Sequence, residues 1–305
     1  MSLRAEILRL AIRLIAKRSA SPTPDIGKLR RCTDRIKPLI PGPSRETTAH
    51  RLSAGGVPAL HVATAQSRPD RHVLYLHGGG YVFGSVSHYR DFIWRIADAA
   101  QARVLCIDYR LAPEHKFPAA VDDAVAAYRW LLAQGAKSDQ TAIMGDSAGG
   151  GLALAALLRL RDEGASLPKA AVALSPWTDL AVTAPSYAQN EASDPMLVAA
   201  QARYYAACYL GGADPRHPYA SPLYGDPTGL PPCLIQVGSD EILHDDAVRM
   251  AERLRAAGCR VVLEVWPRMP HVFQLFARIL PEARDAIAHI GAFLRAEWAG
   301  GDGRP

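Results

Sequence analysis

The chain has 305 residues, of which 49% are hydrophobic, and this is enough for the core of one large α/β domain or two small ones. Its formal net charge of +5 comes from 35 basic and 30 acidic residues that are scattered, which argues against a nucleic-acid partner. The five cysteines show no C-x-x-C spacing. Neither a disulfide framework nor a zinc site is therefore indicated, and a cytoplasmic location is expected.

The first 45 residues predict two helices, over 3–20 and 25–37. The first helix carries apolar side chains along one face, at Leu3, Ile7, Leu10 and Leu14. Because no run in the chain approaches the roughly 18 apolar residues of a membrane span, we expect neither such a span nor a secretory signal. We favour packing of this face on the rest of the protein over adsorption to a membrane, and we expect no stable membrane association.

From residue 46 onward, predicted strands alternate with predicted helices. The strands cover 47–53, 58–64, 72–76, 103–107, 140–144, 169–174, 233–237 and 260–266. The helices cover 118–134, 147–163, 195–210, 245–257 and 281–298. This alternation indicates an α/β fold with a mostly parallel sheet and helices on both faces. The first two strands, joined by Gly55-Gly56, are expected to form an antiparallel hairpin.

A long interval between the strands at 169–174 and 233–237 interrupts the alternation. Long insertions in compact domains are usually functional, and open α/β sheets bind ligands at the carboxyl ends of their strands. We therefore divide the chain into an N-terminal helical cap segment, 1–45, and an α/β domain, 46–305. The domain is expected to carry a cap insertion at about 180–215.

The pentapeptide Gly145-Asp146-Ser147-Ala148-Gly149 stands between a predicted strand and a predicted helix. A G-x-S-x-G motif in that context is typical of a nucleophile elbow, in which the serine sits on a strained turn at the end of the sheet. A side chain at either glycine would collide with the adjacent strand or helix. Ser147 is therefore predicted to be a nucleophile, rather than part of an ordinary glycine-rich loop.

A serine nucleophile needs an adjacent base, which in turn needs an orienting acid. In α/β-hydrolases the order along the chain is serine, acid, histidine. The histidines after Ser147 are His217, His244, His271 and His289. Only His271 lies on a short loop directly after the last predicted strand, where a base can reach the elbow. His271 is therefore predicted to be the base.

The acid is expected on the loop that follows the strand at 233–237. Asp240 lies there and is favoured, and Glu241 is the main alternative. Asp245 is interpreted as the N-cap of the next helix, and Asp246 as a favourable charge in its first turn.

The glycine run Gly78-Gly79-Gly80 follows His77 and the strand at 72–76. Ester hydrolysis builds negative charge on the carbonyl oxygen, and backbone N–H groups fixed around that oxygen stabilise the charge. The amides of Gly78, Gly79 and Ala148 are predicted to form this oxyanion hole, with His77 bracing the loop. A phosphate-binding loop is the alternative, but neither common glycine pattern for one is present.

Together these motifs resemble the bacterial hormone-sensitive-lipase family of carboxylesterases, and the resemblance extends from about residue 45 to the C-terminus. A further family motif is Tyr109-Arg110-Leu111-Ala112-Pro113-Glu114, followed by Phe117-Pro118-Ala119. The resemblance implies an α/β-hydrolase fold with an eight-stranded sheet and a helical cap, and ester hydrolysis without metal or cofactor. Many members have Asp-Pro-Leu at the acid, whereas this chain has Asp240-Glu241-Ile242-Leu243, so Glu241 stays open as the acid.

The sequence thus predicts a serine carboxylesterase that hydrolyses small short-chain esters through an acyl-enzyme. Its pocket is predicted to be lined by Phe83, Met196, Tyr204 and Val272. A lactone hydrolase with the same triad is the alternative, and an amidase is a weaker one. A non-catalytic binding module on this fold would be expected to lose Ser147, Asp240 or His271, and all three are present.

The strand at 260–266 predicts a contact between two copies of the chain. In the usual order of this fold it is an edge strand, and it is rich in β-branched residues and contains no proline. Only Arg260 and Glu264 discourage pairing with another strand. Because the family resemblance also points to dimers joined in this way, we expect an antiparallel homodimer with a two-fold axis.

Overall fold

The computed structural model describes residues 2–17, 21–40, 42 and 47–300. Within these residues one eight-stranded sheet has the order β1-β2-β4-β3-β5-β6-β7-β8. The strands are β1 (Thr48–Ala54), β2 (Val57–Ala63), β3 (Arg68–Leu76), β4 (Ala102–Ile107), β5 (Thr141–Asp146), β6 (Ala170–Leu174), β7 (Cys233–Gly238) and β8 (Val261–Trp266). β2 pairs antiparallel with β1 and with β4, and the other neighbours are parallel. The predicted sheet and its N-terminal hairpin are confirmed.

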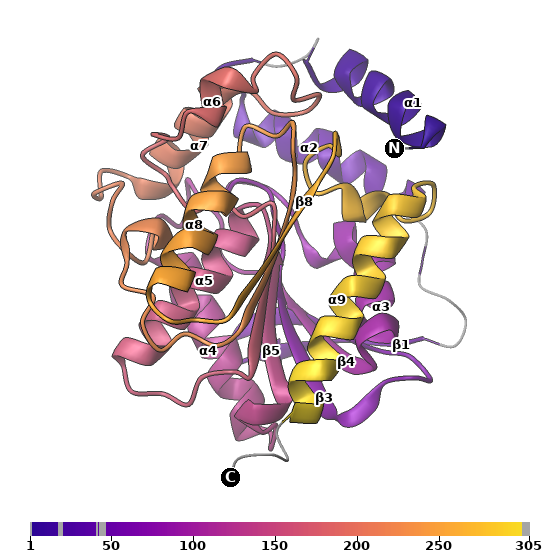
Figure 1. Ribbon diagram of the computed structural model, residues 1–305, viewed down its shortest axis with the longest axis vertical. Helices are drawn as coiled ribbons and strands as arrows, with labels where there is room; N and C mark the ends of the chain where they lie inside the picture. Colours follow the sequence, from indigo (N-terminus) through magenta and orange to yellow (C-terminus); the bar gives the residue numbers. More distant parts are fainter. Residues whose placement is uncertain (1, 18–20, 41, 43–46, 301–305) are drawn as a thin grey trace.

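Helices cover both faces of this sheet (Figure 1). They are α1 (Leu3–Ile12), α2 (Ile26–Ile36), α3 (Val86–Ala100), α4 (Ala119–Ala133), α5 (Ala148–Asp162), α6 (Ser186–Gln189), α7 (Ala199–Leu210), α8 (His244–Ala256) and α9 (Pro281–Ala299). α3 and α9 pack on one face of the sheet, and α4, α5 and α8 pack on the other. Parallel strands covered on both faces are typical of α/β folds.

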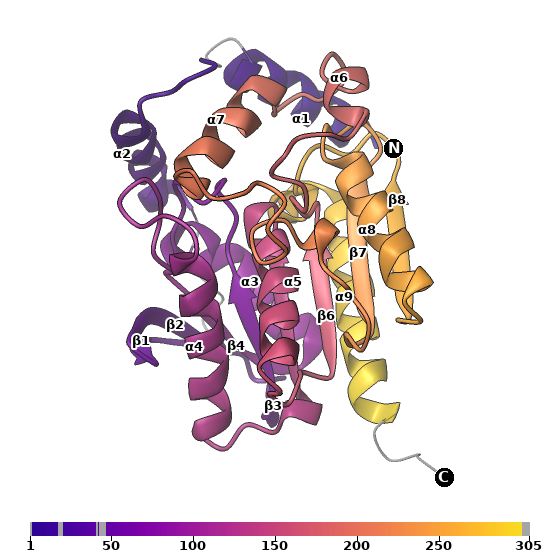
Figure 2. The same cartoon turned by 90° about the vertical axis from the view of Figure 1, so that its left-hand side faces the viewer.

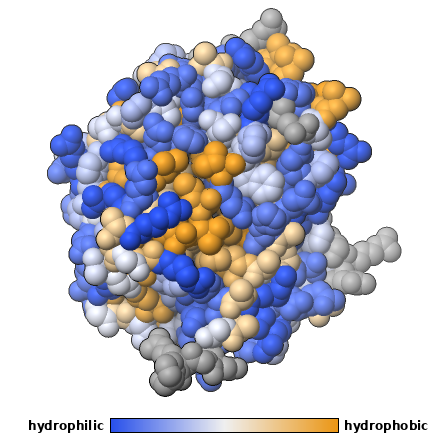
Figure 3. Space-filling view, viewed as in Figure 1, coloured by the Kyte–Doolittle hydropathy of each residue, from blue (hydrophilic) through white to orange (hydrophobic). Residues whose placement is uncertain are grey.

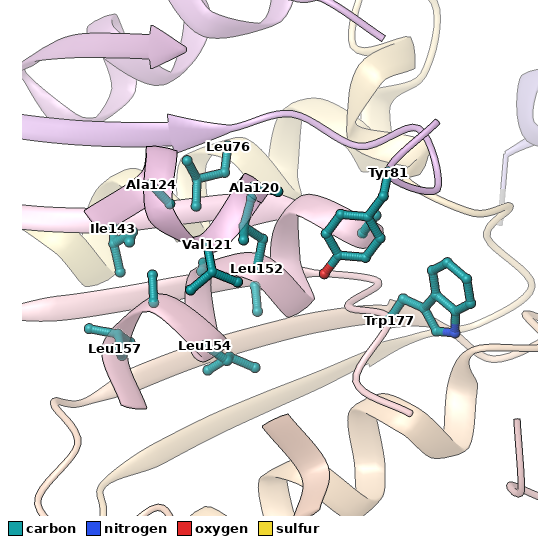
Figure 4. Packing of buried hydrophobic residues seen from close by; sticks show 14 of the residues in the cluster. Leu76, Tyr81, Ala120, Val121, Ala124, Ile143, Leu152, Leu154, Leu157 and Trp177 are labelled. Carbon is teal, nitrogen blue, oxygen red and sulfur yellow. The ribbon is translucent and has the colours of Figure 1, made fainter. Parts of the chain in front are cut away.

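Each central strand contributes to two hydrophobic cores because its side chains alternate between the faces. On β3, Leu74 and Leu76 belong to the core beneath α4 and α5, whereas Val73 and Tyr75 belong to the core beneath α3 and α9. Figure 4 shows the first core, where Leu76 packs with leucines and alanines of α4 and α5. The two cores hold the parallel strands in register, so that their carboxyl ends lie together at one end of the sheet.

Helix α3, which follows the glycine loop after β3, has no counterpart among the predicted helices. Its buried residues recur at helical spacing, including Tyr89, Phe92, Ile93 and Ile96. That periodicity was the available signal for a helix. The other predicted helices and strands are present, and most of their ends differ by a few residues. The first helix, predicted over 3–20, is α1 followed by a π-helix over Arg13–Lys17, and residues 18–20 lie outside the described residues.

The predicted packing of the apolar face of α1 is wrong. Leu3, Ile7 and Leu10 are exposed by 76%, 61% and 61%, and Ala5 is the residue that α1 buries fully. In Figure 3, a group of hydrophobic side chains projects from the surface where Figure 1 places α1. The inward face of α1 is instead polar at Arg9, which contacts the loops described below.

Four helices lie together beyond the carboxyl ends of the strands, namely α1, α2, α6 and α7 (Figure 2). They come from the two segments that the sequence analysis interpreted as a cap. Gln201 of α7 donates a hydrogen bond to the carbonyl of Ser21, which ties the insertion to the N-terminal segment. The predicted boundary at residues 45 and 46 lies outside the described residues.

Candidate active site

The nucleophile elbow joins β5 to α5 and holds Ser147 in a strained conformation, with φ 54° and ψ −123°. The turn is tight because its flanking glycines touch other backbone. A Cβ atom at Gly145 would lie 2.2 Å from the carbonyl oxygen of Gly149, and one at Gly149 would lie 2.1 Å from that of Leu76. Only glycine fits at either position, and a strained serine held in this way is typical of a functional site.

His271 lies on the loop after β8 and is 5% exposed. Its Nδ1 is 2.7 Å from Oε2 of Glu241, a fully buried residue on the loop after β7. The other carboxylate oxygen of Glu241 accepts hydrogen bonds from Ser175 Oγ at 2.7 Å and from the Gly238 amide at 2.6 Å. The structure therefore brings Glu241 to the histidine and fixes both oxygens of its carboxylate.

Asp240, the acid favoured from the sequence, does not contact His271. Its carboxylate points toward α1, where Oδ2 is 2.7 Å from Nη2 of Arg9 and Oδ1 accepts from Ser239 Oγ at 2.8 Å. Consecutive residues on a tight loop direct their side chains apart, so only one of the two carboxylates can face the histidine. This corrects the choice between Asp240 and Glu241.

Arg9 connects α1 to three other segments at once. Besides Asp240, its guanidinium donates to the carbonyl of Arg268, three residues before His271, at 2.5 Å, and to that of Ser193 at 3.4 Å. The side chain is 12% exposed. Nothing in the sequence signalled this residue, because its partners lie far away along the chain.

Asp245 is not the N-cap of α8, which begins at His244 without a side-chain cap. Its carboxylate accepts the amide of Ser186 at 2.9 Å and lies 2.9 Å from Nδ1 of His244. Asp246 is fully buried and accepts the amides of Thr178 and Asp179. Both carboxylates tie the insertion to α8 rather than serving α8 alone.

The electrostatics of His271 favour its protonated form. Burial alone would lower the pKa of His271, but the charge and hydrogen bond of Glu241 oppose burial and leave the pKa above the ordinary value of 6.5. Asp194 and Asp146 add to this effect through their charge. An imidazole that is stabilised as imidazolium suits a residue that accepts a proton and later returns it.

The glycine loop after β3 presents two amides to the cavity, and they are not the pair predicted. Gly78 N–H already donates to Asp146 Oδ1 and to Tyr89 Oη, each at 2.9 Å. By contrast, the amides of Gly79 and Gly80 donate no hydrogen bond to any described residue, and both glycines line the cavity that contains Ser147. Of the two glycines predicted in this loop, Gly78 therefore has an occupied amide, and Gly80 stands beside Gly79 as the glycine whose amide is not engaged by any described residue.

Asp146, the residue before the serine, holds this loop in place. Its carboxylate is buried and accepts hydrogen bonds from Tyr75 Oη at 2.6 Å, Tyr89 Oη at 2.8 Å and the Gly78 amide. Burial raises the pKa of Asp146 to about 6, although these hydrogen bonds oppose the rise. The motif residue thus links the elbow to the glycine loop.

His77 is buried behind the same loop. Its ring stacks on Tyr109 with centroids 4.4 Å apart, and its Nδ1 lies 2.7 Å from the Gly78 carbonyl oxygen. Burial lowers the pKa of His77. The side chain supports the loop, as expected for a bracing residue.

Ser147 and His271 line one cavity of about 220 Å³. Three of the four predicted wall residues, Phe83, Met196 and Val272, line it as well. Tyr204 does not: the neighbouring Tyr205 faces the cavity instead, with its ring centroid 6.2 Å from that of Phe83. On a helix, adjacent residues point in directions about 100° apart, so only one of two neighbouring tyrosines of α7 can face the cavity.

The insertion is anchored to the acid loop by Asp194, a buried residue that the sequence analysis did not single out. Asp194 Oδ1 accepts the amides of Met196 at 2.8 Å and Leu197 at 2.9 Å, and Oδ2 accepts that of Ile242 at 2.9 Å. One carboxylate therefore connects the wall of the cavity to the residue after Glu241.

Within the described residues, no group of three or more His, Cys, Asp or Glu side chains is arranged to hold a metal ion. The same part of the chain contains no helix that is both long and apolar enough to cross a membrane.

The strained serine, the buried acid–histidine pair and the free amides at the end of a parallel sheet define an α/β-hydrolase. A family model described as alpha/beta hydrolase fold matches residues 73–275. An acetyl-hydrolase of Streptomyces hygroscopicus is 52% identical over 239 residues, which cover 77% of this chain and 80% of that protein. An ethyl acetate hydrolase of Pseudomonas putida is 37% identical, over 72% of this chain and 70% of that protein.

A crystal structure of an esterase from the bacterial hormone-sensitive lipase family superposes with a TM-score of 0.92 and 47% identity, and covers 98% of this chain and 99% of that one. The chain belongs to the α/β-hydrolase fold family and, within it, to the esterases that resemble hormone-sensitive lipase. It is a carboxylic ester hydrolase.

Proposed function

We propose that this protein hydrolyses esters of short carboxylic acids through an acyl-enzyme on Ser147. His271 is the general base and Glu241 the orienting acid. The observation that carries this proposal is the 2.7 Å contact between His271 Nδ1 and Glu241 Oε2, because it leaves the other ring nitrogen for the cavity that Ser147 lines. This is the arrangement that a serine nucleophile requires.

In the first half of the reaction, Ser147 Oγ attacks the ester carbonyl carbon and His271 Nε2 takes the hydroxyl proton. The carbonyl oxygen becomes an oxyanion that accepts hydrogen bonds from the amides of Gly79, Gly80 and Ala148. The carbon–oxygen bond to the alcohol then breaks, and His271 returns the proton to the departing alkoxide. In the second half, water attacks the acyl-enzyme, His271 takes and returns a proton in the same way, and the acid leaves Ser147.

The size of the cavity supports small substrates. Its volume of about 220 Å³ is below the roughly 300–1,000 Å³ of most small-ligand sites. The names of two relatives, acetyl-hydrolase and ethyl acetate hydrolase, point in the same direction. We expect butyryl esters to turn over faster than palmitoyl esters.

We also propose that residues 1–45 and the insertion at about 180–215 act as a cap. Met196 and Tyr205 of the insertion line the cavity, and Lys17 of the N-terminal segment donates a hydrogen bond to the carbonyl of Glu191. The N-terminal segment therefore supports an insertion that shapes the pocket. Deletion of residues 1–40 should impair turnover more than folding, and unchanged kinetics would reject this role.

The experiment that tests the reaction is labelling with a fluorophosphonate, which reacts with activated serines, followed by intact mass measurement. Wild-type protein should gain one adduct and lose its activity on p-nitrophenyl butyrate. Ser147→Ala should gain no adduct, and Ser147→Ala, His271→Ala and the double variant should all lose several orders of magnitude in kcat. Losses that add up in the double variant would contradict a triad.

We propose further that two copies pair through β8. This strand ends the sheet, and Val262 and Val265 are 40% and 41% exposed. Figure 3 shows a hydrophobic band across the face where Figure 1 places β8. Glu264 does not oppose pairing, since its carboxylate is bonded to Gln236 and Trp266 beside α9.

Sedimentation tests the dimer. Wild type should sediment as a dimer at micromolar concentration, and Val262→Pro or Val265→Lys should yield monomers because each disrupts an exposed edge. A monomeric wild type would reject the proposal.

We also propose a cytoplasmic location. The five cysteines, which are all free, support it because disulfides are rare in that compartment.

A further inference from the structure

A second cavity, of about 470 Å³, adjoins the catalytic one. It lies among α2 and the turn after it, α3, and the segment around the short helix Phe273–Phe276. Four residues line both cavities: Phe83, Tyr89, Leu275 and Phe276. Since a side chain that lines two cavities stands between them, these four residues form a wall, and the three aromatic residues among them are called here the aromatic wall.

The second cavity is suited to hydrocarbon because the polar side chains in its interior, His88 and Asp91, already have partners. The two ring nitrogens of His88 contact Ser85 Oγ at 2.9 Å and the Thr33 carbonyl at 3.1 Å. The Asp91 carboxylate pairs with Arg95 at 3.2 Å. The lining that remains to contact a ligand is largely apolar, and its main side chains are Ile36, Ile40, Phe92 and Ile279.

The far end of this cavity reaches the protein surface. Ile36 is 50% exposed and Ile279 is 47% exposed, and the charged Arg278 beside Ile279 is exposed as well. A hydrocarbon chain that entered from the catalytic side would therefore replace water against isoleucines, which is favourable because apolar surface leaves water.

The members of the aromatic wall differ in how firmly they are held. Tyr89 is fixed by its hydroxyl, which is bonded to Asp146 and Gly78. The Phe83 backbone is fixed, since its amide donates to the Gly79 carbonyl at 3.1 Å, but its side chain makes only apolar contacts, including a ring contact with Tyr205. Phe276 is likewise half-buried and apolar. The phenylalanine side chains can thus be truncated without removing a hydrogen bond.

We propose that the second cavity is a latent subsite for an unbranched hydrocarbon chain of the ester, and that Phe83 and Phe276 set the chain-length limit by closing it. This inference rests on the proposed ester hydrolysis and adds its specificity determinants. The limit on substrate length then arises from a removable wall, not from the end of the apolar space. The chain that enters is either the acyl or the alcohol part of the ester.

The test measures kcat/KM for Phe83→Ala and Phe276→Ala on p-nitrophenyl butyrate and decanoate, and on ethyl and octyl acetate. Each variant should raise the long-to-short ratio by about tenfold or more in one of the two series, because several methylenes gain an apolar site. The series that responds identifies the acyl or the alcohol chain as the occupant. Melting temperatures are measured in parallel to detect a loosened fold.

A second substitution at the far end supplies the control. Adding Ile279→Trp to Phe83→Ala fills the second cavity, so the long-to-short ratio should return toward the wild-type value while activity on the short ester persists. An unchanged ratio in both single variants would overturn the inference, and so would a gain that Ile279→Trp does not reverse. Failure of the proposed function itself is distinguishable, because wild-type protein would then hydrolyse no butyrate and take up no fluorophosphonate.

Discussion

The two loops that carry Ser147 and Glu241 are built in different ways. The elbow is marked by its own residues: Gly145 and Gly149 lie so close to the backbone of the same turn and of β3 that neither position accommodates a Cβ atom. The acid loop is determined from a distance. Its two adjacent carboxylates are assigned by Arg9 of α1 on one side and by Ser175 and His271 on the other. A motif can therefore point to the proposed nucleophile, whereas tertiary contacts select the carboxylate that meets His271.

The largest expected effect concerns the acid loop. Glu241→Gln keeps the shape of the side chain but removes the charge that orients and stabilises the histidine, so kcat should fall by about 10³–10⁴-fold. Asp240→Asn is the matched control, one residue away, and should cost less than about tenfold. Steady-state kinetics on p-nitrophenyl butyrate measure both. The opposite ranking would return the acid role to Asp240.

The elbow should fail through folding rather than through chemistry. Gly149→Ala places a methyl group 2.1 Å from the Leu76 carbonyl oxygen and 2.5 Å from that of His77, so backbone must move. The free energy of unfolding should fall by about 3 kcal/mol or more, measured by urea denaturation. Gly300→Ala, whose methyl group would meet no atom within 4 Å, serves as control. Equal stability of the two variants would refute the steric account.

The pH profile of kcat/KM reports the contact between His271 and Glu241. His271 must be neutral to accept a proton, and its pKa lies above 6.5, so kcat/KM should rise with pH through an inflection above 6.5. In Glu241→Gln the raising charge is gone while burial still lowers the pKa, so the inflection should move to lower pH. Rates between pH 5 and 9 measure this. A wild-type inflection below 6.5 would contradict the stabilising contact.

The smallest effect is expected at Arg9. Arg9→Ala removes contacts to the carbonyls of Arg268 and Ser193 and leaves Asp240 unpaired, so kcat should fall a few-fold. A double-mutant cycle with Asp240→Asn should give a coupling free energy of about 1 kcal/mol. Arg9→Lys should restore part of the rate. Strict additivity would show that the ion pair does not position the loop.

The features that could be predicted from the sequence are those that depend on neighbouring residues, as at the elbow, and not those that depend on distant contacts, as at the acid loop. The sheet, the elbow and His271 were predictable because hydrophobic periodicity and motif spacing are local. The sequence favoured Asp240, Gly78 and Tyr204. The structure instead brings Glu241 to His271, leaves the Gly80 amide without a bond to any described residue, and places Tyr205 at the cavity. Each of these depends on the direction of a side chain or amide, and that direction is set by residues distant in sequence. For example, the Gly78 amide donates a hydrogen bond to the carboxylate of Asp146, which is far from Gly78 along the chain.

The hydrogen bonds of Asp194 have a consequence for how this enzyme can be altered. Because one carboxylate holds the amides of Met196, Leu197 and Ile242, the insertion wall and the acid loop share an anchor. A substitution of Asp194 will therefore disturb the pocket wall and the acid loop together. Phe83 belongs to the segment after β3, which lacks that anchor, so it is a position at which selection, natural or in the laboratory, can broaden substrate range without disturbing the acid loop.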